Sequence, residues 1–236
     1  MSHFLHNERC PRCASKGNDK TGNNLAIYSD QHKYCFACGY YVKGDIVEKY
    51  KTRHIKPVHN TKFFRPSNTM PSKALIYLKK YGLLDQEIND NYFWDDYGYL
   101  VFNGEQYQNA RNFNEEGAKY ISRGVIRGNE KIFHKTKNAI IVVEDAISAI
   151  KISRVCSSVP IHNSVIPLEL ILRLSKQFSE LGVWLDPDKQ KESLTEANKA
   201  SLYFDKVNVI WSNGDPKEYS TEEIKKKILE KGIVLC

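Results

Sequence analysis

The sequence predicts an α/β chain, α+β overall, with a small metal-stabilised module at the amino terminus and a parallel sheet at the carboxyl terminus. Three short apolar runs, 139–143, 182–185 and 207–211, are each followed by acidic residues in a strand, acid, helix order. Two Cys-x-x-Cys pairs lie near the amino terminus. Between these regions, aromatic segments separated by Asn-Gly and Asp-Tyr-Gly turns predict antiparallel strands.

Positive charge is concentrated in the amino-terminal part of the chain. Of the 236 residues, 1–72 hold twelve Lys and Arg against five Asp and Glu, whereas 73–236 hold twenty-three of each. A localised basic excess favours contact with a polyanion, most simply nucleic acid, although solubility alone also accounts for it. No signal-peptide pattern and no apolar run near eighteen residues occurs, so we expect a cytoplasmic protein without a membrane partner.

Residues 1–50 are predicted to form a zinc ribbon. Four of the six cysteines form one compact set, namely Cys10, Cys13, Cys35 and Cys38. Two such pairs place four thiolates around one tetrahedral Zn²⁺ per chain, and a module this small needs the metal to fold. Segments 24–28 and 33–36 predict its strands. Ribbons occur in transcription, translation and repair proteins, so zinc alone does not decide the function.

Residues 51–72 contain three prolines and scattered bases without periodicity, which predicts a flexible basic linker. Its bases would follow phosphates, or the segment is simply a solvated tether. The next predicted domain is 73–137, with helices at 73–82 and 85–88 and strands at 92–94, 99–102 and 107–113.

The carboxyl-terminal domain, 138–236, is organised around Asp186 and Asp188. Carboxylates two residues apart on an extended backbone point to the same side, and Pro187 restricts them further. Hard oxygen donors at the carboxyl end of a parallel strand suit Mg²⁺ or Mn²⁺, although Asp and Pro are also ordinary turn residues. Glu144 and Asp215 follow the other two apolar runs, which predicts one acidic rim.

Several segments resemble known families. VVEDAISAI, WLDPDK and NGDPKEYS resemble the successive motifs of the Toprim domain, found in primases, topoisomerases and some nucleases. NNLAIYSDQHKYCFACGYYVKGD resembles the amino-terminal zinc ribbon of bacteriophage primases. QNARNF, AKYISRG and KIFHK, in that order, resemble the first half of the RNA polymerase domain of bacterial and phage primases.

The resemblance implies a DNA primase that makes short RNA primers on a single-stranded DNA template from ribonucleoside triphosphates by metal-dependent nucleotidyl transfer. It implies catalysis and magnesium binding by Glu144, Asp186 and Asp188, with Asp215 as a further magnesium ligand. It implies nucleotide and template binding by Arg111, Lys119, Arg123 and Lys135, and template recognition by Asp30 and His32. The sequence contains no GxxxxGK[ST] motif, so we expect a separate replicative helicase as partner.

The sequence departs from the primase motifs at some positions, and other functions are alternatives to a primase. Primases commonly have Gly and Asp where this chain has Asp145 and Ser148, so Asp145 either adds a metal donor or caps the following helix. His162 is expected to be structural. One rival is a recombination mediator that joins a zinc finger to a Toprim domain, disfavoured because its zinc finger is internal. Others are a Toprim nuclease and a primase relic acting as a zinc-dependent adaptor.

Overall fold

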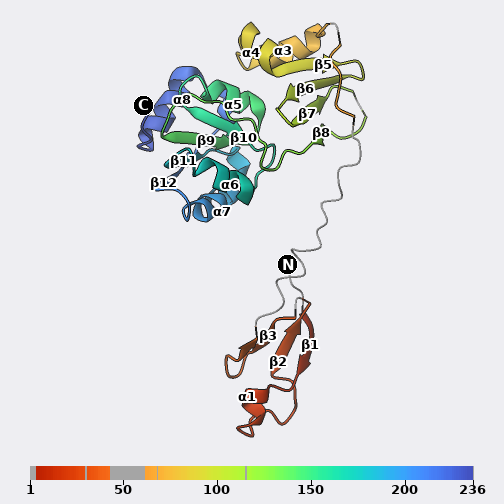
Figure 1. The fold of residues 1–236 in the computed structure, drawn as a ribbon, viewed down its shortest axis with the longest axis vertical. Coiled ribbons are helices and arrows are strands. Elements are labelled where there is room, and N and C mark those ends of the chain that lie inside the picture. Colours follow the sequence, from red (N-terminus) through yellow and green to blue (C-terminus); the bar gives the residue numbers. More distant parts are fainter. Residues whose placement is uncertain (1–3, 30, 43–61, 68, 115, 236) are drawn as a thin grey trace. The chain divides into compact units, whose positions relative to one another are not determined.

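The computed structural model describes residues 4–29, 31–42, 62–67, 69–114 and 116–235. The chain divides into two compact units, 1–59 and 60–236, and each is described by itself (Figure 1). The predicted template-reading residue Asp30 and the first half of the predicted linker, 51–61, lie outside the described residues.

The first unit contains a four-stranded antiparallel sheet in the order β1-β2-β3-β4. Its elements are β1 (Phe4–Glu8), α1 (Pro11–Ala14), β2 (Leu25–Tyr28), β3 (Lys33–Cys35) and β4 (Tyr41–Val42). Pro11 opens α1 at the first Cys-x-x-Cys pair, where its missing N–H costs nothing. The core consists of the cysteines with Leu25 and Ile27. The predicted strands β2 and β3 are confirmed; β1 and β4 were not predicted.

The second unit begins with two helices and an antiparallel sheet in the order β5-β6-β7-β8. Its elements are α3 (Ser72–Lys80), α4 (Asp85–Asn91), β5 (Tyr92–Asp95), β6 (Tyr99–Asn103), β7 (Tyr107–Asn112) and β8 (Tyr120–Gly124). Gly82 has φ +75°, which ends the first helical segment as its position predicts. Both helices and the first three strands confirm the prediction; β8 was not predicted.

The two faces of this antiparallel sheet have different partners. Leu100, Phe102 and Tyr107 pack in one cluster with side chains of α3 and of a later helix, α5 (Ala146–Ile152). Val101 and Ala110 point to the opposite face, where Phe64 covers them and is 3% exposed. The central strand β6 is therefore covered on both faces.

Residues 62–67, which we call the strap, lie on that second face. The Phe64 N–H donates to Gln108 Oε1 at 2.6 Å, and the Ser67 N–H donates to the Trp94 carbonyl at 2.7 Å. Pro66 forms an isolated antiparallel bridge with Asp95. The range predicted as linker thus includes a segment that packs on the sheet.

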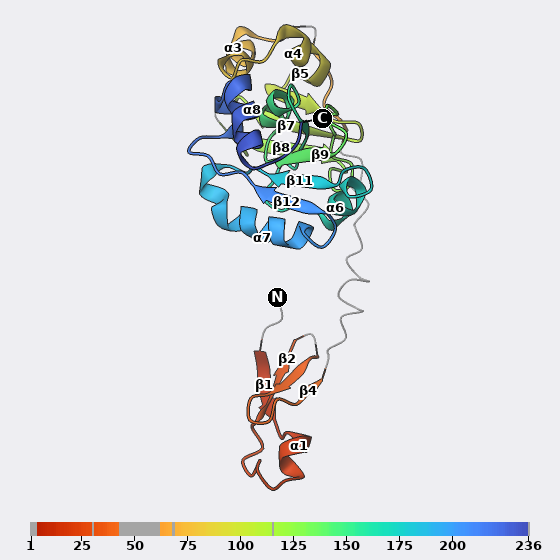
Figure 2. The same cartoon turned by 90° about the vertical axis from the view of Figure 1, so that its left-hand side faces the viewer.

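The last part of the unit is a four-stranded parallel sheet in the order β10-β9-β11-β12. Its strands are β9 (Ala139–Val143), β10 (Ser157–Pro160), β11 (Glu180–Val183) and β12 (Lys206–Val209). Helices α5 and α8 (Thr221–Glu230) cover one face, while α6 (Leu168–Leu174) and α7 (Gln190–Ala200) cover the other (Figures 1 and 2). The mixed α/β class predicted from the sequence is confirmed.

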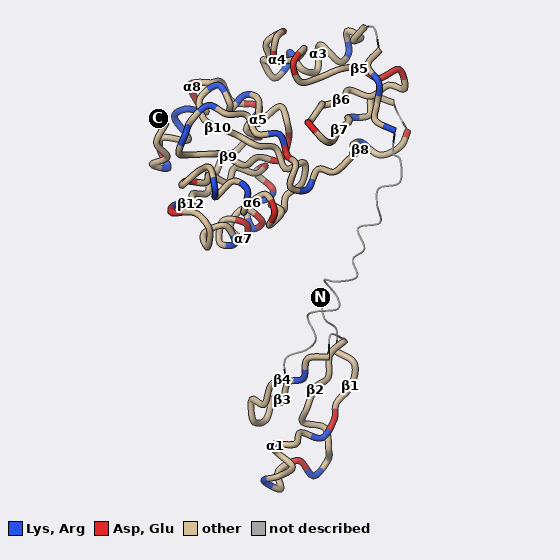
Figure 3. Tube along the Cα trace, viewed as in Figure 1, with Lys and Arg blue, Asp and Glu red and all other residues tan. Residues whose placement is uncertain are grey.

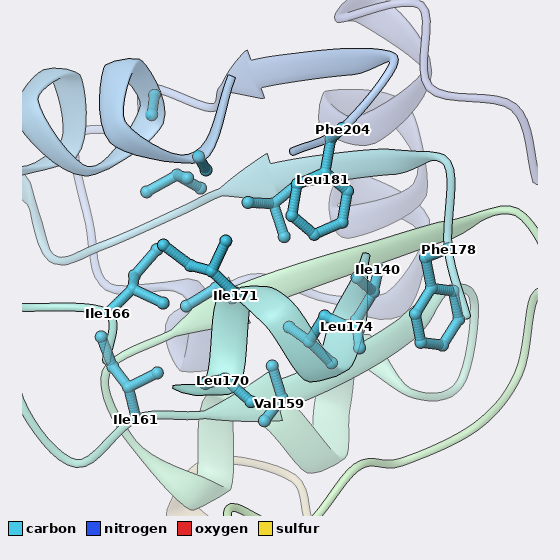
Figure 4. Close-up of a cluster of buried hydrophobic side chains, with 14 of the residues drawn as sticks. Ile140, Val159, Ile161, Ile166, Leu170, Ile171, Leu174, Phe178, Leu181 and Phe204 are labelled. Atoms are coloured by element: carbon cyan, nitrogen blue, oxygen red, sulfur yellow. The ribbon is translucent and has the colours of Figure 1, made fainter. Parts of the chain in front are cut away.

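The core of this sheet explains why its strands are apolar on both sides. Every residue of β9 is buried. Figure 4 shows the cluster on one face, where Leu170, Ile171 and Leu174 of α6 meet Ile140 and Leu181 of the sheet. The other face packs against α5 and α8. A sheet covered on both faces can present polar groups to a ligand only at its edges and strand ends.

Charges of both signs occur on the outer helices α6, α7 and α8 (Figure 3). No helix within the described residues is long and apolar enough to cross a membrane.

Candidate functional site

The four cysteines are positioned to bind one metal ion. Their sulfur atoms all lie within 4.8 Å of one another, and the Cys10–Cys38 and Cys13–Cys35 Sγ pairs are each 3.7 Å apart. A tetrahedral zinc with Zn–S bonds of about 2.3 Å separates its sulfurs by about 3.8 Å. The spacing therefore fits zinc.

A buried carboxylate fixes the first cysteine loop. Asp19 is 1% exposed and accepts from the Cys10 N–H at 2.6 Å, while the N–H groups of Gly22 and Asn23 donate to its other oxygen at 2.9 and 3.2 Å. These backbone hydrogen bonds, that from Cys10 first, lower the pKa of Asp19. An ionised carboxylate thus holds the loop that carries Cys10.

The sheet of the first unit has a face turned away from the cysteines. A shallow hollow of about 620 Å³ lies there, lined by Phe4, Asn7, Asn23, Asn24, Ala26, Tyr28, Phe36 and Ala37. Phe36 is 73% exposed. The predicted reading residue His32 stacks on Tyr28, with ring centroids 4.1 Å apart and planes 10° from parallel. Exposed aromatic rings beside amide side chains are suited to stacking and hydrogen-bonding with unpaired bases.

The predicted carboxylates converge at the carboxyl ends of the parallel strands. Glu144 directly follows β9, Asp186 follows the buried extension of β11, and Asp215 follows β12. Glu144 Oε1 accepts from the Asp186 N–H at 3.2 Å, which ties the first two ends together.

Burial raises the free energy of ionising two of these carboxylates. It raises the pKa of Glu144, and it raises the pKa of Asp186 to about 7. Asp186 Oδ1 is buried and has no hydrogen-bond partner within the described part of the chain. A buried carboxylate oxygen without a partner is costly unless a cation binds it, so the donors fit a divalent ion.

Asp188 is arranged differently from Asp186. Its side chain is 71% exposed and lies 2.9 Å from Lys189 Nζ. This contact with Lys189 lowers the pKa of Asp188. Among the described residues, only the cysteines bring three or more potential metal ligands within 4.8 Å of one another. Asp188 would therefore have to turn inward to join Glu144 and Asp186.

Asp145 and Ser148, the positions at which this sequence departs from the primase motifs, form a helix cap. Asp145 is the N-cap of α5 and accepts from the Ser148 N–H at 3.0 Å and from its hydroxyl at 2.9 Å. Lys217 Nζ lies 3.0 Å from Asp145 and 2.6 Å from Asp215. Asp145 is thus held by both the cap and a lysine that was given no role from the sequence.

The opposite wall of the site comes from the antiparallel sheet and α3. Arg111 lies 4.4 Å from the Tyr77 ring centroid and donates to the Tyr120 hydroxyl at 2.8 Å. Lys119 precedes Tyr120 and also lines the wall. Together with Glu144, Asp145, Asp186, Asp215 and Lys217, these side chains border a cleft of about 420 Å³.

Two predicted basic residues lie outside this cleft. Arg123 pairs across the sheet with Gln108, on the face covered by the strap; its guanidinium lies 3.6 Å from the Phe64 ring centroid and donates to the Lys62 carbonyl. Lys135 is exposed and borders a separate hollow beside Phe178. The sequence motifs gave the order of these residues but not the face on which each one lies.

His162 borders the cleft but is engaged with the core. Its Nε2 lies 3.1 Å from the Tyr107 hydroxyl, and its ring packs against Phe102. Burial lowers the pKa of His162 to about 4, so the ring is neutral at physiological pH. Asn109, Tyr77, Tyr81 and Tyr120 also line the cleft without having been predicted. Alternation along β7 from Arg111 could have found Asn109.

Comparison with solved structures gives a fold likeness over almost the whole chain. The zinc-binding and RNA polymerase domains of the Aquifex aeolicus primase match with a TM-score of 0.57 at 15% identity, covering 98% of this chain and 79% of that one. The primase fragment of the bacteriophage T7 primase-helicase protein gives 0.46 at 13% identity, covering 98% of this chain and 100% of that one. A DnaG catalytic core gives 0.49 at 13% identity over 65% and 62%.

No family model and no curated protein matches the sequence. The likeness to the Aquifex primase therefore shows a fold, namely a primase-type fold with a zinc-binding domain.

Proposed function

We propose that this chain is a DNA primase, which joins ribonucleotides on a single-stranded DNA template by metal-dependent nucleotidyl transfer. The observation that carries the proposal is that Glu144 and Asp186 line the same cleft as Arg111 and Lys119. Cation-binding carboxylates opposite phosphate-binding bases are the two halves of a phosphoryl-transfer site. The primase-type fold supports the same conclusion independently.

Glu144 and Asp186 would hold Mg²⁺ or Mn²⁺, with Asp188 and Asp215 at the edges of the site. A bound divalent ion would polarise the α-phosphate and stabilise charge that develops in the transition state. The Asp186 N–H bond to Glu144 fixes the spacing of the two ligands. Asp186 Oδ1 is buried and has no hydrogen-bond partner among the described residues, so a bound cation would stabilise this oxygen in particular.

Arg111 and Lys119 would bind the triphosphate of the incoming nucleotide. Arg111 is held in place by Tyr120 on one side and Tyr77 on the other, so little side-chain entropy is lost when it binds phosphate. Tyr120 is 48% exposed and offers a ring for stacking by a base. Arg123 and Lys135 lie outside the cleft, so we do not assign the triphosphate to them; template binding by these two residues stays a prediction from the sequence.

The zinc unit would read the template. His32 stacks on Tyr28, which borders the hollow with its three asparagine side chains. Stacking would hold unpaired bases, and amide or imidazole groups would discriminate among their edges. The predicted partner of His32 in this role, Asp30, remains a proposal from the sequence.

A primer-synthesis assay tests the proposal. The full chain is incubated with single-stranded DNA, labelled ribonucleoside triphosphates and Mg²⁺ or Mn²⁺, and products are separated by length. We expect template-dependent oligoribonucleotides. Cleavage of the DNA instead would show a nuclease, and DNA binding without synthesis or cleavage would show a mediator or adaptor.

A further inference from the structure

Lys217 places a positive charge inside the acidic rim. Its Nζ lies 2.6 Å from Asp215 Oδ2 and 3.0 Å from Asp145 Oδ2, and its side chain is 13% exposed. Exposed ion pairs are weak because water screens them, but this one is largely shielded. The ammonium group is therefore part of the site.

Two elements, a 3₁₀ turn and α5, hold this lysine in place. It lies in a 3₁₀ turn, Pro216–Glu218, that follows β12. Its carbonyl accepts from Lys151 Nζ at 2.7 Å, and Lys151 is 6% exposed on α5. Its partner Asp145 is fixed as the N-cap of the same helix. A lysine anchored through both its backbone and its head group is positioned rather than freely mobile.

The rim consequently has two unlike halves. Asp145 and Asp215 share the Lys217 ammonium group. Glu144 and Asp186 form no ion pair with any described residue, and Asp186 Oδ1 has no hydrogen-bond partner there either. One half already contains a paired cation, whereas the other half has no cationic group within ion-pair distance among the described residues.

We infer that the Lys217 ammonium group replaces a second divalent ion at this site. It is paired with Asp145 and Asp215, so the acidic rim binds one divalent ion, at Glu144 and Asp186, instead of two. The inference rests on the proposed function for the role of that ion and specifies the number of ions bound. Lys217 acts here as a positioning residue, because it sets the charge and geometry of the carboxylates around the divalent ion.

Manganese titration of the zinc-loaded full chain tests the inference without any nucleotide. The paramagnetic resonance signal of free Mn²⁺ reports how many ions bind and how tightly. We expect one Mn²⁺ per wild-type chain. Lys217→Met removes a repelling charge and frees two carboxylates, so it should bind a second Mn²⁺ or bind the first on the order of tenfold more tightly.

Lys226→Met is the matched control. Lys226 is 77% exposed and pairs with Glu230 on α8, so its removal changes the net charge equally but outside the cleft. We expect wild-type manganese binding for this control and also for Lys217→Arg, which keeps the charge. Two Mn²⁺ ions per wild-type chain, or unchanged number and affinity in Lys217→Met, would overturn the inference.

A second measurement uses only the wild-type protein, in case Lys217→Met fails to fold. An amine-reactive reagent followed by mass spectrometry should leave Lys217 unlabelled both without metal and with saturating Mn²⁺, while Lys226 is labelled in both. Labelling of Lys217 upon addition of Mn²⁺ would show that the ion displaces it from the aspartates, which contradicts the inference.

These results are separable from primer synthesis. A chain that makes no primers but shows the expected manganese and labelling behaviour would contradict the proposed function and leave the role of Lys217 intact. A chain that makes primers while Lys217→Met binds manganese like the wild type would do the opposite.

Discussion

At the scale of single residues, the candidate site depends most on Asp186. It combines a raised pKa of about 7 with a buried oxygen that has no partner in the described residues. Such a group destabilises the protein when it is ionised without a cation. Functional residues of this kind reduce stability in exchange for ligand binding.

The cost of ionising buried Asp186 predicts how the stability of the protein depends on pH. Unfolded Asp titrates at about 4, whereas folded Asp186 keeps its proton up to about pH 7. Between these pH values the folded state therefore binds more protons than the unfolded state. The stability that the raised pKa of Asp186 contributes is present in full below about pH 4 and is lost as the pH rises to about 7. In chelator at pH 8, Asp186→Asn should unfold at a higher temperature than wild type in calorimetry of the larger unit.

Asp188→Asn is the matched control, because its exposed carboxylate has a lowered pKa and gains no stability from neutralisation. Adding Mg²⁺ should raise the unfolding temperature of the wild type but not of Asp186→Asn, because only the folded wild type binds the ion. Equal stability of Asp186→Asn and wild type at pH 8 would contradict this account of burial.

A second residue-scale prediction concerns the metal-binding cysteines. Cys35→Ala removes one of four ligands, so it should release the zinc and unfold residues 8–42 while the larger unit keeps its unfolding temperature. Zinc content and limited proteolysis measure this. Cys156→Ala alters a buried thiol that lies outside the cluster and should retain one zinc per chain. Full zinc retention by Cys35→Ala would show that the four sulfurs do not act as one site.

At the scale of elements, strand direction and strand alternation decide which residues meet. Parallel strands bring their carboxyl ends to one edge, so the sequence alone could predict that Glu144, Asp186 and Asp215 converge. It could not place Arg111 and Arg123 on opposite faces, because β8 was not recognised and its register with β7 was unknown. The strap was missed because a short segment without periodicity resembles a linker until its contacts are known.

The strap gives a prediction at this scale. Phe64 is 3% exposed and covers the sheet, whereas the adjacent Phe63 is 49% exposed. Phe64→Ala should lower the free energy of unfolding by about 3–5 kcal/mol, the usual cost of truncating a buried Phe. Phe63→Ala should change it by about 0.5 kcal/mol or less. Equal effects of the two substitutions in denaturant titrations would show that the strap is not part of the folded core.

At the scale of the whole molecule, the proposed function assigns template reading and bond formation to two different compact units of the chain. The compact unit that contains the cysteines and His32 is distinct from the one that contains the carboxylates. The amino-terminal basic excess lies in the first of these and in the connecting residues. We therefore expect start-site choice and primer extension to respond to different substitutions.

His32→Ala tests this division. It should alter or abolish the choice of start sites, by on the order of 1–3 kcal/mol for each lost base contact. Extension of a preformed short primer should be unchanged. His6→Ala, which removes an exposed histidine of the same unit that pairs with Glu8, is the control. A start-site map on a template panel that is identical for His32→Ala and wild type would place recognition elsewhere.

We expect the carboxylates at the ends of the parallel strands to be essential for nucleotidyl transfer. The most direct measurement is the rate of dinucleotide formation on single-stranded DNA by Glu144→Gln and by Glu222→Gln, an equal charge change at an exposed position of α8. We predict that Glu144→Gln loses at least about 10²-fold, since several kcal/mol of transition-state stabilisation disappear with the ligand, while Glu222→Gln retains the wild-type rate. A near-normal rate for Glu144→Gln would contradict the account.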